Sequence, residues 1–263
     1  MKELLVIKIG GKLLKETVMD SHLENVISLA KGGKHPVIVH GGGLEITEKL
    51  SILGKKPRFV EGQRYTDSES LEIVEMVLAG INKRIVGMIN LLGEKAVGIS
   101  GKDALLVEAK KLKGKHDLGY VAEVERVNPE ILHILLDNGF IPVISPVAMD
   151  RKGVTYNINA DVFASQFSAA IGAERLVYLT DVSGILENPE DDKSVIEQIR
   201  IEEVEELIRK GTITEGMIPK INSCVEALRK GIKEIDVLDG RKKDALSPLI
   251  NKQKKLGGTK IMK

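Results

Sequence analysis

The sequence has almost no cysteine and few aromatic residues. Cys224 is the only cysteine among 263 residues, so the chain forms no internal disulfide and no cysteine-cluster zinc site. Tryptophan is absent and aromatic residues make up only 3% of the chain, so the core must be mainly aliphatic. Hydrophobic residues still reach 43%, which is ample for a buried core.

The chain also lacks a charge bias and a long hydrophobic run. Lysine and arginine number 39 against 38 aspartates and glutamates, and a net charge of +1 gives no bulk attraction to nucleic acid or an anionic membrane. No run approaches the roughly 20 apolar residues of a membrane helix. The first apolar run, residues 4–9, is short, is interrupted by Lys8 and lacks a cleavage site, unlike a signal peptide. We therefore expect a cytoplasmic protein with no membrane or nucleic-acid partner.

Short apolar runs rich in Val, Ile and Leu recur along the chain, and we predict them to be strands. They span residues 4–9, 36–40, 96–100, 140–146, 175–180 and 234–239. Such runs are typical of parallel strands covered on both faces. Segments predicted to be helices lie at 20–31, 43–53, 68–79, 82–92, 129–138, 160–171, 201–210 and 219–230, with Gly80 as the stop of the third. The alternation predicts an α/β fold, a three-layer α/β/α sandwich around a mainly parallel open sheet.

Two stretches interrupt this alternation. Residues 55–67 and 105–127 mix β-forming residues with turn residues and many charges. We predict that both are β-hairpins or lids near the edge of the sheet.

Two glycine-rich turns follow predicted strands and precede predicted helices. The first is "KIGG" at 8–11 and the second is "HGGG" at 40–43. Ligands of open α/β sheets bind at the carboxyl edge, where glycines let the backbone approach an anion. Lys8 lies inside a strand, where a lysine needs a partner. The sequence has neither a G-x-x-x-x-G-K-[ST] loop nor a G-x-G-x-x-G fingerprint, so a phosphate site of another type is predicted. A tight turn without a ligand is the plain alternative for either motif alone.

Three later motifs carry polar residues at predicted helix starts and strand ends. "YNINAD" (156–161) ends in Asp161, which would fit a helix cap or first-turn acid as well as a site. "LTDVSGIL" (179–186) follows a strand. In "TITEGMIPKINS" (212–223), Lys220 falls in a first helical turn and opposes the helix dipole, which a nearby anion would explain. A solvated surface lysine is the alternative.

Taken in order, these motifs resemble the amino acid kinase family, and within it the kinases that act on N-acetyl-L-glutamate. The matching stretches cover nearly the whole chain: "KIGG" (8–11), "VHGGG" (39–43), "GQRYTD" (62–67), "EMVLAGINK" (75–83), "GISGKD" (98–103), "NGFIPVISP" (138–146), "YNINAD" (156–161), "LTDVSGIL" (179–186), "GMIPKI" (216–221) and "GTKI" (258–261). Each is weak alone, whereas their common order is specific.

The resemblance implies ATP-dependent phosphorylation of the γ-carboxylate of N-acetyl-L-glutamate, a step of arginine biosynthesis. Mg²⁺ would arrive with ATP, without a dedicated carboxylate cage in the protein. The implied lobes, within one continuous-sheet domain, are residues 1–173 for the amino-acid substrate and 174–263 for the nucleotide. A homodimer is implied, with an interface around residues 68–92. Because the chain starts at its first strand, we expect no strong feedback inhibition by arginine.

The resemblance also implies roles for charged residues and glycines near the phosphates. Lys8 and Lys220 would stabilise the transferring phosphoryl group from opposite sides. Asp161 would hold the two lysines in place. Gly10 and Gly11 would offer backbone N–H groups to the phosphates. Phosphoryl transfer depends mainly on such positioning and charge stabilisation.

The implied acceptor site contains Gly42 and Gly43 at the reacting end of the substrate. Arg64 would pair with the α-carboxylate, for which a guanidinium is better suited than an ammonium, and Asn157 would hydrogen bond the substrate. The nucleophile is a carboxylate of pKa ~4.3, already ionised at pH 7, so no general base is needed and His40 is expected to shape its turn. The implied nucleotide-pocket residues are Thr180, Asp181, Val182, Ser183, Gly184, Ile185, Thr212, Ile213 and Thr214.

Two alternatives remain open from the sequence. Related kinases act on aminoadipate or glutamate linked to a carrier protein, but the compact "GQR" and the "NAD" at 159–161 favour a free acetylated substrate. A catalytically inactive amino-acid sensor could share the fold. Such a protein would be expected to lose Lys8, Asp161 or Lys220, and all three are present.

Overall fold

The chain folds into two compact units that each contain part of a mainly parallel sheet. The first unit comprises Met1–Val37 and Ala164–Lys263, and the second comprises Ile38–Phe163. The computed structural model describes residues 3–15, 17–188, 190–192, 194–213, 217–251, 253 and 256–263. The two units are groups of residues that pack together, whereas the predicted lobes, 1–173 and 174–263, are named for the substrate that each would bind. The assignment of the lobes therefore stays a prediction.

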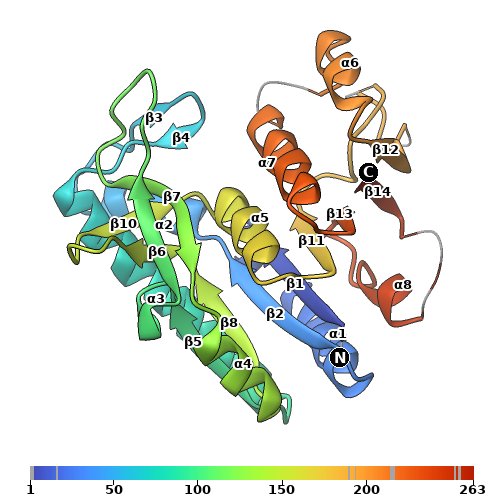
Figure 1. Ribbon diagram of the computed structural model, residues 1–263, viewed down its shortest axis with the longest axis horizontal. Helices are drawn as coiled ribbons and strands as arrows, with labels where there is room; N and C mark the ends of the chain where they lie inside the picture. Colours follow the sequence, from blue (N-terminus) through green and yellow to red (C-terminus); the bar gives the residue numbers. More distant parts are fainter. Residues whose placement is uncertain are drawn as a thin grey trace. The chain divides into compact units, whose positions relative to one another are not determined.

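The sheet of the first unit has the strand order β12-β14-β13-β11-β1. Its elements are β1 (Leu4–Ile9), η1 (Leu13–Lys15), α1 (Met19–Lys31), β11 (Arg175–Thr180), β12 (Gln198–Arg200), α6 (Val204–Arg209), α7 (Ile218–Arg229), β13 (Glu234–Asp239), α8 (Ser247–Ile250) and β14 (Gly258–Met262). All neighbours in this order pair in parallel except β13 and β14. Helices α1 and α7 cover opposite faces (Figure 1). This arrangement agrees with the predicted α/β/α layers.

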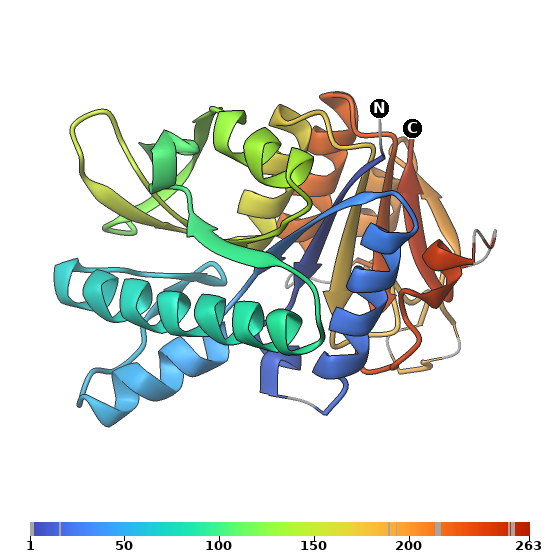
Figure 2. The same cartoon turned by 90° about the horizontal axis from the view of Figure 1, so that it is seen from below.

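The second unit repeats the layered arrangement around β2, β8 and β5, which pair in parallel. Its elements are β2 (His35–His40), which begins in the first unit, α2 (Gly43–Ile52), α3 (Ser68–Leu91), β5 (Ala96–Ser100), α4 (Glu130–Asp137), β8 (Ile141–Ser145) and the start of α5 (Ala160–Ala170). Helix α3 packs against β5 and β8, and α4 packs against β8. Figure 2 shows these two helices on opposite sides of the strands. The carboxyl ends of the three strands therefore share one edge, next to the start of α2.

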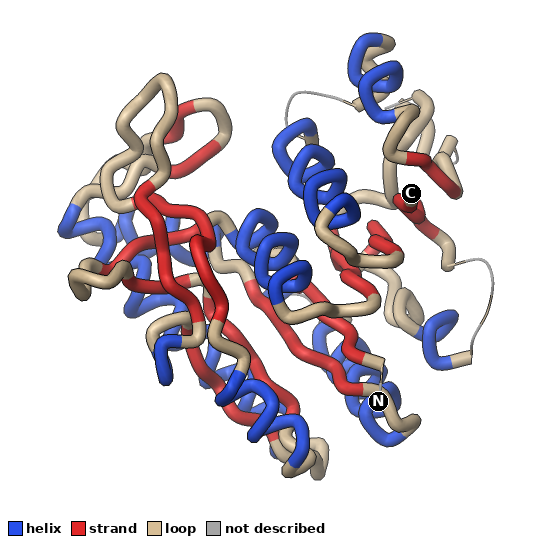
Figure 3. The backbone as a smooth tube through the Cα atoms, in the orientation of Figure 1, coloured by secondary structure: helices blue, strands red, loops and turns tan. Residues whose placement is uncertain are grey.

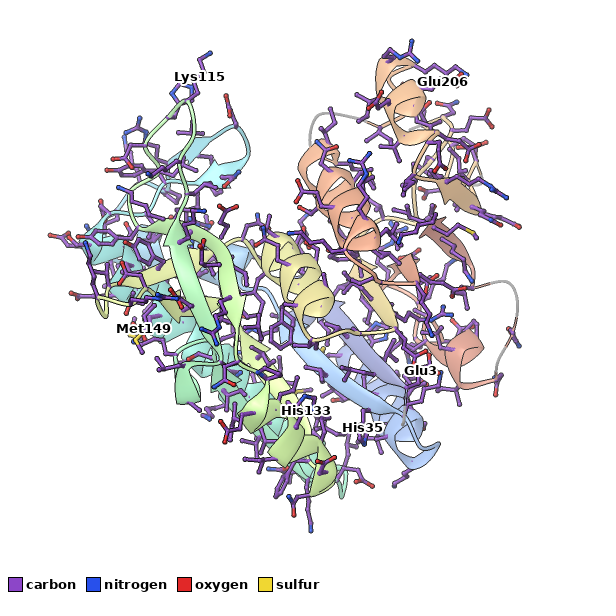
Figure 4. The ribbon with its side chains drawn as sticks, viewed as in Figure 1. Glu3, His35, Lys115, His133, Met149 and Glu206 are labelled. Carbon is purple, nitrogen blue, oxygen red and sulfur yellow. The ribbon has the colours of Figure 1, made fainter. Side chains whose placement is uncertain are left out.

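The second unit also holds a small closed barrel with the strand order β10-β7-β6-β9. Its strands are β6 (Val107–Lys111), β7 (Val121–Val127), β9 (Val147–Met149) and β10 (Thr155–Ile158), and η2 (Asp103–Leu105) precedes them. They are drawn in red in Figure 3, and Figure 4 labels Lys115 at the tip of the β6–β7 loop. The hairpin predicted at 105–127 is confirmed, but it is half of a barrel rather than a separate lid. The other predicted hairpin is β3 (Phe59–Val60) with β4 (Gln63–Arg64).

Helix α3 corrects the prediction of two helices separated at Gly80. It runs without a break from Ser68 to Leu91, and the side chain of Asp67 caps it by accepting a hydrogen bond from Ser70 N at 2.7 Å. Its buried stripe continues across Gly80 through Leu78 and Ile81. A glycine inside a helix costs about 1 kcal/mol relative to alanine, which the packing of this long apolar stripe outweighs.

The predicted aliphatic core is confirmed in the central strands. In β1, β2, β11 and β13 every residue after the first is buried. Lys8 is the charged exception in β1, with only 8% of its surface exposed. Among the described residues, no helix has the length and apolar character required to cross a bilayer.

Candidate functional site

The turn between β2 and α2 contains two glycines with different surroundings. A Cβ atom on Gly42 would lie 2.7 Å from Leu78 Cδ2 and 2.9 Å from Ile81 Cδ1, closer than real side chains approach. Gly43 is exposed, and apart from its chain neighbours and its own helix no described atom lies within 4 Å of the position of its Cβ. Gly42 thus allows α2 to pack against α3. Gly43 leaves the amino end of α2 open, where helix N–H groups and the helix dipole favour an anion.

His40, the last residue of β2, stabilises this turn and is completely buried. Its Nδ1 donates a hydrogen bond to Gly41 O at 3.0 Å, and its Nε2 accepts one from Asn82 Nδ2 at 3.3 Å. Burial lowers the pKa of His40 to about 4, so the ring is neutral at pH 7. Because both ring nitrogens are engaged inside the protein, the predicted structural role of His40 is confirmed.

Arg64 lies beside the open end of α2 and has unused hydrogen-bonding capacity. Its Nη2 donates to Gly43 O at 2.9 Å and to Thr47 Oγ1 at 2.7 Å, and its Cζ lies 4.7 Å from the ring centroid of Phe59. Its Nη1 is buried and has no hydrogen-bond partner among the described residues. Burial lowers the pKa of Arg64, although a guanidinium stays charged at neutral pH. A buried donor without a partner is costly, so the arrangement favours an anionic ligand here.

Asn157 is connected to Arg64 through Thr66, a fully buried residue that sequence reasoning did not single out. Asn157 Nδ2 donates to Thr66 Oγ1 at 3.4 Å, and Thr66 Oγ1 donates to Arg64 O at 3.3 Å. Thr66 stands within the quoted "GQRYTD" motif, which was the available signal. The second unit therefore brings Gly43, Arg64 and Asn157 into one hydrogen-bonded group.

Asp161 lies in the first turn of α5, but it is not the cap of that helix. Asn159 Oδ1 accepts hydrogen bonds from Asp161 N at 2.9 Å and from Val162 N at 3.3 Å. The capping function is thus performed by Asn159. The predicted role of Asp161 beside the lysines stays a prediction.

The first unit brings the two predicted lysines to one face of its sheet. Lys8 and Tyr178 are register partners in neighbouring parallel strands, so their side chains leave the same face. Lys220, in the first turn of α7, places its Nζ 5.7 Å from the ring centroid of Tyr178. The buried Tyr178 therefore has Lys8 beside it in the neighbouring strand and the ammonium of Lys220 near its ring.

Gly10 and Gly11, the next residues after β1, differ in their backbone contacts. The N–H of Gly10 donates to Leu179 O at 3.1 Å, so it extends the sheet and is not available to a phosphate. This corrects the expectation for Gly10, whose lack of a side chain instead permits the approach of β11, since a Cβ would lie 3.2 Å from Leu179 O. No described residue accepts a hydrogen bond from the Gly11 N–H.

Lys12 and Asp181 form an ion pair at the carboxyl edge of β1 and β11. Lys12 Nζ lies 2.5 Å from Asp181 Oδ2, and the side chains are 69% and 38% exposed. Burial opposes ionisation of Asp181, but the hydrogen bond and charge of Lys12, together with hydrogen bonds from its own backbone and from Thr180, outweigh burial, so the pKa of Asp181 lies below its usual range. Lys12 was not predicted, although it directly follows "KIGG".

A second charged group lies at the end of β13. Arg241 donates from Nε to Asp239 Oδ1 at 2.8 Å, and from Nη2 to Asp239 Oδ2 at 2.9 Å and Ser183 Oγ at 3.0 Å. The intervening Gly240 donates its N–H to Thr180 O at 2.8 Å. Thr180 and Ser183 were predicted from the sequence, but "DGR" (239–241) was not. It stands at the end of β13, as "TD" (180–181) stands at the end of β11.

The remaining predicted nucleotide residues divide into exposed and packed positions. Val182 is 36% exposed, whereas Ile185 and Ile213 bury their side chains in the unit. Gly184 has a φ of +145°, and Ile185 N donates to Thr259 Oγ1 at 2.8 Å. The N–H groups of Thr212 and Ile213 both donate to Leu207 O. Ile185 and Ile213 thus shape the region by packing, while Thr214 lies outside the described residues.

The charged residues at these strand ends do not form an obvious metal cage. No group of three or more potential metal-ligating side chains occurs among the residues that the structure describes. Asp181 and Asp239 are each engaged by a cation, as described above. Such a set of lysines, arginine and paired aspartates is suited to an anion that brings its own cation.

Comparisons with known proteins identify the family. The model of the amino acid kinase family matches residues 3–239. An acetylglutamate kinase of Archaeoglobus fulgidus is 50% identical over 247 residues, covering 90% of this chain and 85% of the relative, and one of Methanothrix thermoacetophila is 46% identical with the same coverage. The smu.665 protein of Streptococcus mutans has a structure that matches with a TM-score of 0.84 at 29% identity, covering 100% of this chain and 99% of that one. An N-acetylglutamate synthase of Neisseria gonorrhoeae matches with a TM-score of 0.87 at 23% identity, covering 99% of this chain and 59% of that one, and this likeness concerns the fold. The chain belongs to the amino acid kinase family.

Proposed function

We propose that the protein transfers the γ-phosphoryl group of ATP to the γ-carboxylate of N-acetyl-L-glutamate. The products are ADP and N-acetyl-L-glutamyl 5-phosphate, an acyl phosphate of arginine biosynthesis. Relatives that carry the acetylglutamate kinase name at 42–50% identity support this assignment. The observation that carries it is the buried Nη1 of Arg64, which lies beside the start of α2 and has no hydrogen-bond partner in the described part of the chain.

We assign the acceptor to the second unit. The α-carboxylate of the substrate accepts hydrogen bonds from Arg64, whose planar donor group matches a carboxylate. Asn157 supplies an amide that can donate to or accept from the acetylated amide of the substrate. The N–H groups at the start of α2 then meet the γ-carboxylate and orient it for attack on the phosphoryl group.

We assign ATP and its Mg²⁺ to the first unit. Lys8 and Lys220, which approach the same face of β11, are suited to neutralise charge on the phosphoryl oxygens. Lys12 and Arg241 extend the cationic edge, and their aspartate partners hold them in position. The Mg²⁺ is proposed to be carried mainly by phosphate oxygens and water. Direct transfer requires both substrates to be bound at once, with Asp161 proposed to orient the lysines.

No general base is needed in this reaction. A carboxylate of pKa about 4.3 is already ionised at pH 7 and attacks phosphorus directly while the P–O bond to ADP breaks. His40, neutral and engaged at both ring nitrogens, is in keeping with such chemistry. We expect the rate to depend on orientation and charge stabilisation.

The test is an assay that detects the acyl phosphate itself. The protein is incubated with MgATP and N-acetylglutamate, glutamate or aspartate, and the product is trapped with hydroxylamine as a hydroxamate, while ADP is measured in parallel. We expect hydroxamate and ADP in equal amounts with N-acetylglutamate and little of either with the free amino acids. ADP without hydroxamate, or a preference for free glutamate, would refute the substrate assignment.

We also propose that the protein is a cytoplasmic homodimer. Large apolar side chains remain exposed on α3 and just after it, including Met76 at 53% and Leu91 at 90%. Apolar surface of this kind is typical of an interface, and it lies within the predicted segment 68–92. Both ATP and biosynthetic intermediates are available in the cytoplasm. Light scattering that gives a monomer mass would contradict the dimer.

A further inference from the structure

Asn82 is a polar residue in the middle of the buried stripe of α3. Only 3% of its surface is exposed, and the stripe on either side of it consists of Leu78, Ile81 and Ile85. An amide in such a place is destabilising unless its hydrogen bonds are made. The contacts of Asn82 therefore indicate why an amide, rather than another aliphatic residue, stands here.

The amide group of Asn82 faces acceptors from three strands. Its Nδ2 lies 2.9 Å from Val143 O in β8, 3.3 Å from Ile99 O in β5 and 3.3 Å from His40 Nε2 in β2. Backbone carbonyls accept and never donate, so the side-chain nitrogen, and not the oxygen, must point toward them. The two N–H groups of one amide are thus shared among acceptors in the three parallel strands β2, β5 and β8.

This orientation also fixes the proton of His40. The ring nitrogen that faces the Asn82 N–H must accept, which leaves Nε2 without a proton. The other nitrogen faces the carbonyl of Gly41 and must donate, so the proton is on Nδ1. The direction of the Gly41 carbonyl is therefore set by a chain of bonds that starts at Asn82.

Gly98 provides the room that this arrangement requires. A Cβ on Gly98 would lie 1.8 Å from Asn82 Oδ1 and 3.0 Å from Val86 Cγ2. The φ angle of Gly98 is not in the left-handed region, so its backbone does not demand glycine. The absence of a side chain at position 98 is explained by the side chain of Asn82.

We propose that Asn82 is a positioning residue for the acceptor substrate. It holds His40 in the Nδ1–H tautomer, and His40 holds the Gly41 carbonyl, so the N–H groups of Gly43 and Leu44 keep their direction at the start of α2. Asn82 does not touch the substrate. This proposal rests on the proposed function, in which these N–H groups meet the γ-carboxylate.

The tautomer is tested by NMR of the histidine ring nitrogens, which needs no activity. Histidine is labelled with ¹⁵N in the full-length protein, and the His40 signals are assigned by comparison with His40→Gln. We expect a neutral ring with its proton on Nδ1 in the parent protein, and a changed Nε2 signal in Asn82→Ala. A proton on Nε2 in the parent protein, or unchanged ring signals in Asn82→Ala, would overturn the proposal. If only the substrate assignment is wrong, the expected tautomer is still observed.

Kinetics test the consequence for the acceptor site. In Asn82→Ala we expect kcat/KM for N-acetylglutamate to fall roughly 10- to 100-fold, the range for a small misplacement of catalytic groups. The KM for ATP should stay within about twofold, since the change is confined to the acceptor site. Ile89→Ala is the control, because Ile89 is fully buried in the same helix but has no role in the turn. An equal loss in Ile89→Ala would assign the effect to stability alone.

The close approach of Gly98 and Asn82 provides an independent variant. Gly98→Ala should displace the amide and reproduce the kinetic defect, although Asn82 remains in the chain. In the Asn82→Ala background the same change should add less than about a twofold further loss, because contacting residues are not additive. Full additivity of the two changes would show that Gly98 and Asn82 act separately and would refute the mechanism.

Discussion

Replacement of Arg64 by lysine tests the acceptor site most directly. The substitution keeps the positive charge but removes the planar group that makes three different contacts. In the structure, Nη2 donates to Gly43 O and Thr47 Oγ1, the guanidinium lies over Phe59, and Nη1 has no hydrogen-bond partner among the described residues. A lysine offers one nitrogen and cannot occupy both positions.

The size of the effect follows from these separate contacts. A hydrogen bond to a charged group contributes about 1.5–3 kcal/mol, and every 1.4 kcal/mol is tenfold in affinity, so loss of the Nη1 bond to the substrate should weaken binding roughly 10- to 150-fold. The bonds from Nη2 are made to neutral groups and contribute only about 1 kcal/mol to folding. Substrate affinity should therefore fall much more than stability.

The assay is steady-state hydroxamate formation, with the two substrates varied in turn. In Arg64→Lys we expect a KM for N-acetylglutamate at least about tenfold higher, a KM for ATP within about twofold of the parent value, and a small shift in urea midpoint. Arg58→Lys is a matched control, since Arg58 lies 4.9 Å from the ring of Tyr65 beside the same hairpin. It should leave both KM values nearly unchanged.

Two results would refute this reasoning. If Arg64→Lys changes the KM for the acceptor by less than about threefold, the free Nη1 does not bind the substrate carboxylate. If Arg58→Lys raises that KM equally, the effect belongs to the shape of the hairpin rather than to the guanidinium of Arg64.

Three further predictions concern packing, the transition state and pH. Gly42→Ala places a Cβ 2.7 Å from Leu78 Cδ2, so we expect a loss of about 1–3 kcal/mol in the free energy of unfolding, measured by urea titration. Lys220→Ala should lower kcat about 100-fold or more with little change in either KM, because its contacts strengthen in the transition state, and an unaltered kcat would exclude that role. Burial raises the pKa of Asp236 from its ordinary value of 3.8 to about 6. Between these two pH values the carboxyl group is protonated in the folded state and ionised in the unfolded state. The stability of the parent protein relative to Asp236→Asn should therefore decrease by roughly 2–3 kcal/mol as the pH rises from 4 to 6, and parallel stability curves would contradict this.

The main strands of the sheet were predictable because they are continuous apolar runs. Strands β9, β10, β12 and β14 were not predicted, since each is short and none forms a continuous apolar run like those of the main strands. Strand β9, for example, pairs with β10 and β6 in the closed barrel. Short strands of this kind are stabilised by pairing and burial more than by their own composition. The break wrongly predicted in α3 has the same origin, because tertiary packing outweighs the local cost of Gly80.

The sequence indicated candidate residues for the site but not the hydrogen bonds that these residues make. Strand ends that carry glycine, lysine or aspartate predicted a ligand site at the carboxyl edge, and this site stays a prediction. The contact of Lys12 with Asp181 spans 169 positions, and the register of β1 with β11 decides that Gly10 bonds to Leu179. Such pairings depend on strand order and register, which a local motif does not contain.

The "HGGG" turn shows how one sequence pattern can combine several physical requirements. Gly41 supplies the carbonyl that fixes the His40 ring, Gly42 makes room for the side chains of α3, and Gly43 keeps the start of α2 open. At Gly43 packing does not explain the glycine, since among the described residues no atom beyond its chain neighbours and its own helix lies within 4 Å of the position of its Cβ. At Gly42 the obstacle to a side chain is Leu78 and Ile81, within the protein itself. A run of glycines at a strand end therefore indicates a binding site only where packing does not already explain each glycine.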